Sequence, residues 1–237
     1  MTPYPYIYEH IRCKGFEVRH IEQHLARLDS LSRTILMTPS GVTYDALHLK
    51  VAEALREEGY SSQHANVVVV RCYGGGDFEV EPLECLYDEF SLRALRPQCH
   101  LCNYSGEFIV RNTSAKESLL EIERSRAVAT DRSVSMWRSD EGEIVAIDGA
   151  PVVAVFDDEI RFSRMGEGVE FDIAFGVAEM GRRSVTRGAI MEEDLLSAKE
   201  LFTVDYRGIT SILSFASKAY MDIVAEKLAR QVADTER

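Results

Sequence analysis

The spacing of apolar residues predicts a strand pair and two helices in the first sixty residues. Apolar and polar positions alternate on both sides of a Lys14-Gly15 turn, which predicts a β-hairpin over residues 6–19. A helix is then expected, because apolar residues recur every three or four positions at Ile21, Leu25, Leu28, Leu31 and Ile35. A second helix is expected to begin at Thr43, a suitable N-cap, and to end at Gly59.

A run of β-branched residues marks the next element. Val67–Val70 is continuous and apolar, which predicts a strand buried on both faces. The glycines at 74–76 follow as a turn. Further strands are expected at Ser91–Leu95 and His100–Tyr104, and residues 106–113 are expected to form a crossover between two halves of the chain.

The second half alternates between short apolar runs and turns. A helix is expected around Lys116, followed by four strands at residues 133–137, 143–147, 152–156 and 159–162. Asp157-Asp158 between the last two strands predicts a tight antiparallel turn. A helix near Phe171–Met180 comes next.

The last part of the chain is expected to hold an acidic helix start at 192–194, two more strands and a closing amphipathic helix from about Ser217. The order of elements predicts an α+β fold of two mixed α/β lobes. The predicted division is 1–105, a linker at 106–113, and 114–237.

Composition narrows the classes of function. The formal net charge of −12 is unfavourable for nucleic-acid binding, which requires clustered Lys and Arg. No stretch approaches the roughly 20 apolar residues of a membrane span, and the first ten residues do not have the pattern of a secretion signal. We therefore expect a cytoplasmic protein without a nucleic-acid or membrane partner, whose five cysteines are free thiols.

Two local motifs are weak. Cys99 and Cys102 have the spacing of a metal or redox pair, but zinc needs further ligands, and His20 and His24 on a predicted helix are the only partners the pattern offers. No metal site is predicted. The glycines at 74–76 lack the Gly-Lys-Ser/Thr that completes a phosphate-binding loop.

Four longer blocks occur in order along the chain. They are YEHIRCKGF at 8–16 leading to HLARLDS at 24–30, Lys116 just after the expected crossover, the strand-hairpin-strand run at 142–162, and EDLLSAKELF at 193–202. Together these blocks resemble the class IV aminotransferases, the fold-type IV pyridoxal-phosphate enzymes that include branched-chain and D-amino-acid aminotransferases and aminodeoxychorismate lyase. Their first block reads FE-x-IR…G-x-F followed by HL-x-RL.

The resemblance implies a specific chemistry. Lys116 would carry pyridoxal phosphate as a Schiff base and move a proton between substrate and cofactor, while Arg27 would bind the cofactor phosphate. The implied activity is that of an aminotransferase or lyase acting on an amino acid or an amino-chorismate-like substrate. A homodimer is implied by analogy. Taken alone, the two side chains are ordinary surface residues of helices.

Several positions depart from the family pattern. Ala146 stands where the family has a glutamate opposite the pyridine nitrogen, and Asp148, two residues further on the expected strand, is the candidate substitute. Gly168-Val169-Glu170 replaces the Gly-Ile-Thr of the phosphate cup, whose backbone N–H groups would remain.

Two further positions differ as well. Tyr206 replaces a second phosphate-binding threonine, and Glu121 replaces the tyrosine five residues after the lysine. The family also has another strand and turn before the first block, so we expect a divergent and N-terminally short member. The alternative is a degenerate homologue that keeps the fold without cofactor binding or catalysis and acts as a binding or regulatory protein.

Overall fold

The computed structural model describes residues 5–85, 89–104, 111–129 and 133–235. The chain divides into two compact units. Unit 1 comprises residues 1–89 and 111–117, and unit 2 comprises residues 90–110 and 118–237. All five cysteines are free thiols, as predicted.

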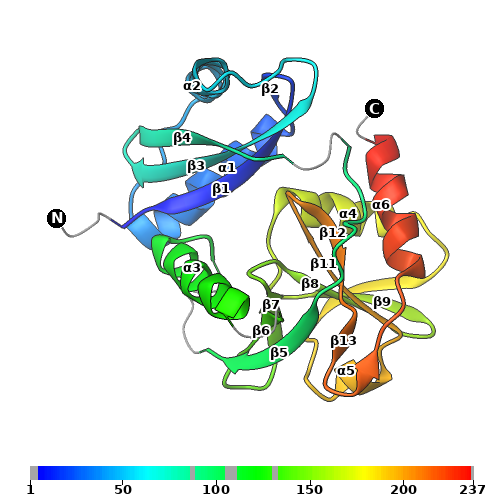
Figure 1. The fold of residues 1–237 in the computed structure, drawn as a ribbon. Coiled ribbons are helices and arrows are strands. Elements are labelled where there is room, and N and C mark those ends of the chain that lie inside the picture. Colours follow the sequence, from blue (N-terminus) through cyan, green and yellow to red (C-terminus); the bar gives the residue numbers. More distant parts are fainter. Residues whose placement is uncertain (1–4, 86–88, 105–110, 130–132, 236–237) are drawn as a thin grey trace. The chain divides into compact units, whose positions relative to one another are not determined.

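Unit 1 is an antiparallel sheet with two helices on one face (Figure 1). The strand order is β2-β1-β3-β4. The strands are β1 Ile7–Lys14, β2 Glu17–Val18, β3 Ala65–Gly74 and β4 Asp77–Leu83. The helices are α1 Ile21–Leu31, continued by a π-helical turn at Ser32–Leu36, and α2 Tyr44–Glu57. The hairpin, both helices and the Val67–Val70 strand are confirmed.

The core of unit 1 follows from the alternation within its strands. Side chains of one face of β1 and β3, among them Ile11, Val68 and Val70, pack against the apolar stripes of α1 and α2. The predicted N-cap of α2 is confirmed, because Thr43 Oγ1 accepts a hydrogen bond from Ala46 N at 3.3 Å.

Strand β4 is absent from the sequence prediction, although its residues do alternate. Phe78 is buried, while its neighbours Asp77 and Glu79 are exposed. Pro82 argues against a strand interior, but β4 lies at the edge of the sheet, where a missing N–H donor is tolerated. The glycine turn before it connects β3 and β4, as predicted.

Unit 2 contains two five-stranded sheets, with strand orders β10-β9-β8-β11-β12 and β14-β13-β5-β6-β7. The strands of the first are β8 Val152–Val155, β9 Glu159–Ser163, β10 Ser184–Gly188, β11 Glu200–Asp205 and β12 Gly208–Ser211. Those of the second are β5 Gln98–Asn103, β6 Val134–Arg138, β7 Ile144–Ile147, β13 Ser214–Phe215 and β14 Lys218–Ala219. The helices are α3 Ser114–Ala129, which begins in unit 1, α4 Val169–Glu179, α5 Asp194–Ser197 and α6 Ile223–Thr235.

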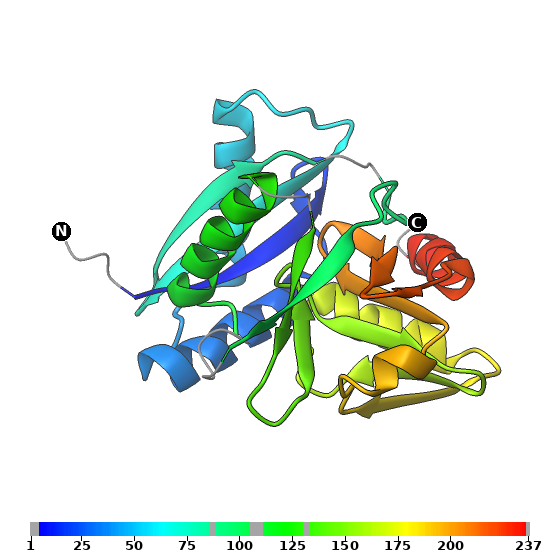
Figure 2. The ribbon, with the colours of Figure 1, turned by 60° about the horizontal axis from the view of Figure 1, so that its bottom comes forward.

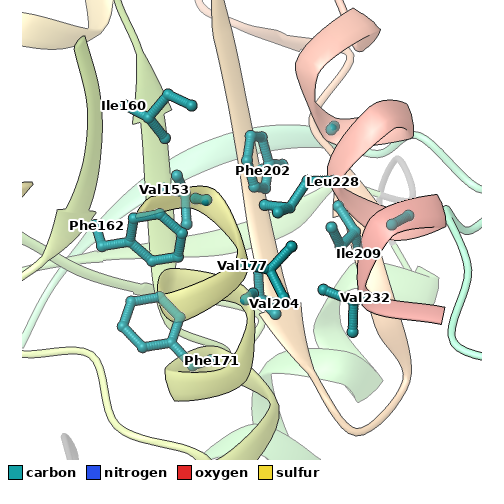
Figure 3. Packing of buried hydrophobic residues seen from close by; sticks show 14 of the residues in the cluster. Val153, Ile160, Phe162, Phe171, Val177, Phe202, Val204, Ile209, Leu228 and Val232 are labelled. Atoms are coloured by element: carbon teal, nitrogen blue, oxygen red, sulfur yellow. The ribbon is translucent and has the colours of Figure 1, made fainter. Parts of the chain in front are cut away.

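Two apolar cores stabilise unit 2. In the first, Phe162, Phe171 and Phe202 pack with aliphatic residues of α4 and of α6, the red C-terminal helix (Figures 2 and 3). In the second, residues of β6 and β7 meet residues of β8 and β11, so the two sheets pack against each other. Burial of each large side chain stabilises the unit by about 1.5–3 kcal/mol.

Two sequence predictions in unit 2 are wrong, and some of its strands were missed. Ser91–Leu95 is not a strand, because it makes a single bridge, from Leu92 to Ile209. Strand β10 was not predicted. The closing helix starts at Ile223 rather than near Ser217, because the buried Glu200 carboxylate accepts hydrogen bonds from Val224 N at 2.8 Å and so caps the helix there.

The boundary between the units differs from the predicted division. Residues 98–103 were assigned to the first lobe, yet β5 pairs in parallel with β6 and belongs to unit 2. Residues 111–117 in turn belong to unit 1. Most of the predicted linker, residues 106–110, lies outside the described residues.

Gly208 provides a test of the packing in unit 2. It has a φ of +105°, and a Cβ there would lie 2.4 Å from the backbone oxygen of Ser91. We predict that Gly208→Ala lowers the free energy of unfolding by about 2 kcal/mol or more. Gly142→Ala is the matched control, because its φ of +85° is also positive but its nearest neighbour, at 3.4 Å, is the flexible end of Met191. Equal losses in urea unfolding would contradict the role of the Ser91 contact.

Candidate functional site

The segment before α3 is anchored to the first strand by backbone hydrogen bonds. Tyr8 N donates to Asn112 O at 2.9 Å, and Ser114 N donates to Tyr6 O at 3.0 Å. Thr113 lies opposite Ile7 between these two bonds. Strand β2 pairs with β1 at Cys13 and Lys14, so the edge of β1 near Ile7 is available to pair with residues 112–114.

This anchoring places Lys116 in the first turn of α3. Its backbone N–H is capped by Thr113 Oγ1 at 3.3 Å, and its Nζ donates to Asn112 Oδ1 at 3.1 Å. Lys116 is 6% exposed. A lysine is rarely so buried, and an amine oriented by a fixed acceptor is suited to covalent or proton-transfer chemistry.

Glu117, the residue after the lysine, anchors the same helical turn to strand β3. Arg71 on β3 donates to both carboxylate oxygens of Glu117, with Nη2 2.7 Å from Oε1, and Tyr6 also donates to this carboxylate. Burial and the neighbouring Glu117 carboxylate raise the pKa of Tyr6 to about 12, so its hydroxyl remains a donor. The paired geometry is strong and directional, which limits rotation of the turn that carries Lys116.

Arg27 is held by Glu9, a buried acid of the first strand. Its Nε donates to Glu9 Oε1 at 3.1 Å, and Glu9 Oε2 lies 3.3 Å from His24 Nδ1. His24 and Arg27 are three residues apart on α1, so both face Glu9 on β1. Burial opposes ionisation of Glu9, but the Arg27 charge and the His24 hydrogen bond together hold the pKa of that carboxyl below its usual value.

Asp148 does not lie on a strand, which corrects the sequence prediction. Strand β7 ends at Ile147, and Asp148 has a φ of +48° in a two-residue turn completed by Gly149 at +73°. Mutual backbone hydrogen bonds between Ile147 and Ala150 close the turn. An Asp-Gly pair with positive φ at both residues is the type I′ hairpin signal. The argument that Asp148 shares a strand face with Ala146 therefore fails.

Two arginines bind the Asp148 carboxylate. Arg207 and Arg124 both donate to it, and Arg207 also pairs with Asp205 at 2.7 Å. Burial would raise the pKa of Asp148, but the two guanidinium charges hold it below its usual value. At neutral pH the Asp148 carboxylate is therefore ionised and forms ion pairs, so it cannot donate a proton.

Ala146 lies among apolar side chains. It is 4% exposed and packs in a cluster with Trp137, Leu120 and Val145. Trp137 is the strand partner of Ala146 and donates its ring N–H to Ser135 Oγ at 3.0 Å. The position that the resemblance assigns to an acid therefore offers neither charge nor a hydrogen-bonding side chain.

The remaining predicted positions are at the start of α4, in the β11–β12 turn and on α3. Gly168 is the N-cap of α4, Val169 is its first residue, and Glu170 is buried in the first turn. The N-terminus of a helix stabilises a negative charge, and Glu170 places its own carboxylate there. Tyr206 is half-buried in the turn, and burial raises its pKa, so its hydroxyl stays protonated. Glu121 is exposed.

The predicted residues therefore fall into two groups. Arg27 and Lys116 belong to unit 1, while Asp148, Glu170 and Tyr206 belong to unit 2. Their supporting partners, Glu9 and Asn112 in unit 1 and Arg207 in unit 2, were not predicted. Asn112 gave no signal of its own. Glu9 is the glutamate of the first block of the resemblance, although no role was predicted for it, and the Asp-Gly turn was readable in the sequence.

These residues fit part of a pyridoxal-phosphate site. The buried amine of Lys116 suits the aldehyde of the cofactor, and the oriented guanidinium of Arg27 suits its phosphate. The apolar surroundings of Ala146 do not fit a protonated ring nitrogen. The two unit 1 side chains are compatible with a cofactor held at two points.

Comparison with known proteins identifies the fold. A putative 4-amino-4-deoxychorismate lyase from Legionella pneumophila superimposes with a TM-score of 0.79 at 12% identity, over 98% of this chain and 91% of that one. A fold IV transaminase from Curtobacterium pusillum gives 0.74 at 16% identity, over 98% and 86%. A branched-chain aminotransferase from Thermoproteus uzoniensis gives 0.75 at 15% identity, over 96% and 84%.

The chain therefore has the fold of the class IV aminotransferases, as predicted, with the α+β architecture expected from its sequence. No protein-family model matches the sequence, and no curated protein matches it. Among the described residues, no helix is long and apolar enough to cross a membrane.

Glu9 provides a pH-dependent test of the unit 1 site. Because its folded-state pKa is lowered, its contribution to stability is complete above the ordinary glutamate pKa of about 4.3 and is lost as the pH falls through the lower folded-state value. We predict that Glu9→Gln costs about 3 kcal/mol at pH 7, measured by urea unfolding, and that this difference narrows below about pH 4. Glu53→Gln, at an exposed position of α2, is the control. A difference independent of pH would contradict the ion-pair account.

Proposed function

We propose that this protein binds pyridoxal phosphate through Lys116 and acts on an amino-acid-like small molecule as an aminotransferase or lyase. The observation that carries the proposal is the burial of Lys116 in an anchored helix turn, with Nζ on Asn112. The fold supports it, because the similar structures include a transaminase and a branched-chain aminotransferase.

Each unit 1 residue has a distinct task in this proposal. The Lys116 amine holds the cofactor and later accepts and returns a proton at Nζ, while Asn112 Oδ1 orients the amine by accepting its hydrogen bond. Arg27 binds the phosphate dianion, and Glu9 fixes the direction of its guanidinium. When bound, the cofactor supplies an aldehyde and an electron-withdrawing ring.

The residues of unit 2 limit the chemistry. Ala146 cannot donate a proton to the ring nitrogen, and Asp148 is occupied by Arg124 and Arg207. The charge that develops on the substrate α-carbon would therefore be stabilised less than it is by a protonated ring. We infer a slow enzyme, or one whose substrate is itself activated toward loss of a proton. A homodimer and a cytoplasmic location belong to the proposal by analogy.

A second function is favoured by one observation. Glu170, at a position where the family has a phosphate-binding threonine, is a carboxylate buried in the first turn of α4. A carboxylate beside a phosphate is repulsive, so this side chain favours a protein that keeps the fold without the cofactor and serves as a binding or regulatory protein.

Titration with pyridoxal phosphate separates the two functions. We predict that the purified protein turns yellow on addition of the cofactor, and that borohydride reduction followed by peptide mass spectrometry locates the cofactor on Lys116. Lys116→Ala should abolish the colour, while Lys14→Ala, at an exposed position, should retain it. A colourless protein whose thermal midpoint does not rise with the cofactor would overturn the enzyme proposal and support the second function.

Arg27 gives a graded readout. A charge-assisted pair to phosphate contributes about 1.5–3 kcal/mol, so Arg27→Gln should weaken cofactor binding by roughly 10–100-fold while the lysine linkage still forms at high concentration. Unchanged affinity would show that the phosphate is bound elsewhere.

A further inference from the structure

Three side chains able to bind a metal meet in unit 2, next to the apolar cluster that contains Ala146. His100 and Cys102 are two residues apart on β5, so they project from the same face of the strand, and Glu123 reaches them from α3. One ligand atom from each side chain lies within 4.8 Å of the other two. We propose that His100, Cys102 and Glu123 form a zinc site.

The donor set favours zinc over the alternatives. A thiolate, an imidazole and a carboxylate are the three ligand types that zinc accepts, whereas calcium and magnesium prefer oxygen alone. Metal–ligand bonds of about 2.0–2.3 Å put tetrahedral ligand atoms roughly 3.3–3.8 Å apart. Closing the present separations to that range requires side-chain movements of about 1 Å, which the exposed His100 and half-buried Cys102 can make.

The surrounding residues already orient the ligands. His100 Nδ1 lies 2.8 Å from Ser133 Oγ, which leaves Nε2 for the metal. Glu123 Oε1 accepts hydrogen bonds from Tyr104 OH at 2.6 Å and from Arg126 Nη1 at 3.3 Å, which leaves Oε2 for the metal. The Arg126 side chain is 71% exposed, so its pairing with Glu123 is a weak competitor.

This zinc site differs from the Cys99–Cys102 motif considered in the sequence analysis. Cys99 lies on the opposite face of β5 and is buried in the core between the sheets, so Cys99 and Cys102 do not act as a pair. His24 is bonded to Glu9 in unit 1. The third ligand, Glu123, comes from a helix and has no fixed spacing from the strand, so no local motif could reveal it.

Three protein ligands leave one coordination position for water. Zinc sites of this composition differ from closed structural sites, which use four protein ligands. Because His100 is exposed, the open position is reached from solvent. The site is built from unit 2 residues alone and does not depend on pyridoxal phosphate.

Cobalt titration tests the proposal. We expect chelator-treated protein to bind one Co²⁺ per chain, with a thiolate-to-cobalt charge-transfer band in the near ultraviolet that Zn²⁺ bleaches. Cys102→Ser should abolish the band. Cys99→Ala, in the same strand but on the other face, should retain it. The absence of a band, or a band that persists in Cys102→Ser, would overturn the proposal.

Direct zinc titration by calorimetry then tests the other two ligands. Ser133→Ala should weaken binding by about 10-fold, and loss of a ligand in His100→Ala or Glu123→Gln by roughly 100-fold or more. His100 is exposed, so its variant tests the site even where substitution of the buried Glu123 disturbs folding. Zinc affinity unchanged in His100→Ala would contradict the site.

Discussion

The backbone pairing between the first strand and residues 112–114 is the constraint on which the candidate site depends. It fixes where α3 begins and therefore where Lys116 lies, and the Arg71–Glu117 pair holds the same turn. The same strand carries Glu9, which orients Arg27. One strand thus positions both side chains expected to hold a cofactor.

The two units differ in which of the expected cofactor-binding residues they contain. Unit 1 keeps a buried amine and an oriented guanidinium, each with a supporting partner. In unit 2 the acid position is an alanine packed against Trp137, and the nearby aspartate forms structural pairs with Arg207 and Arg124. The side chains that would bind a cofactor are therefore present in unit 1, whereas unit 2 has no acid at the position that would activate it.

Periodicity and turn residues were sufficient to predict most of the fold. The helices of unit 1 and the strands of residues 133–162 follow from short-range patterns. Strand β4 was missed because Pro82 argues against a strand, and its position at the sheet edge is not visible in the sequence. The start of α6 was misplaced because it depends on Glu200, more than twenty residues away. For the candidate site, Lys116 and Arg27 came from family resemblance. Asn112, Arg207 and Glu123 could not be predicted from the sequence, because each acts through a contact that only the fold creates.

A crystal structure of the protein grown with pyridoxal phosphate tests the central claim most directly. The account predicts electron density continuous from Lys116 Nζ into the cofactor, with the phosphate bound by Arg27 and no carboxylate on the ring nitrogen. Density joined to another lysine, or a Lys116 without attached cofactor density at saturating pyridoxal phosphate, would contradict it.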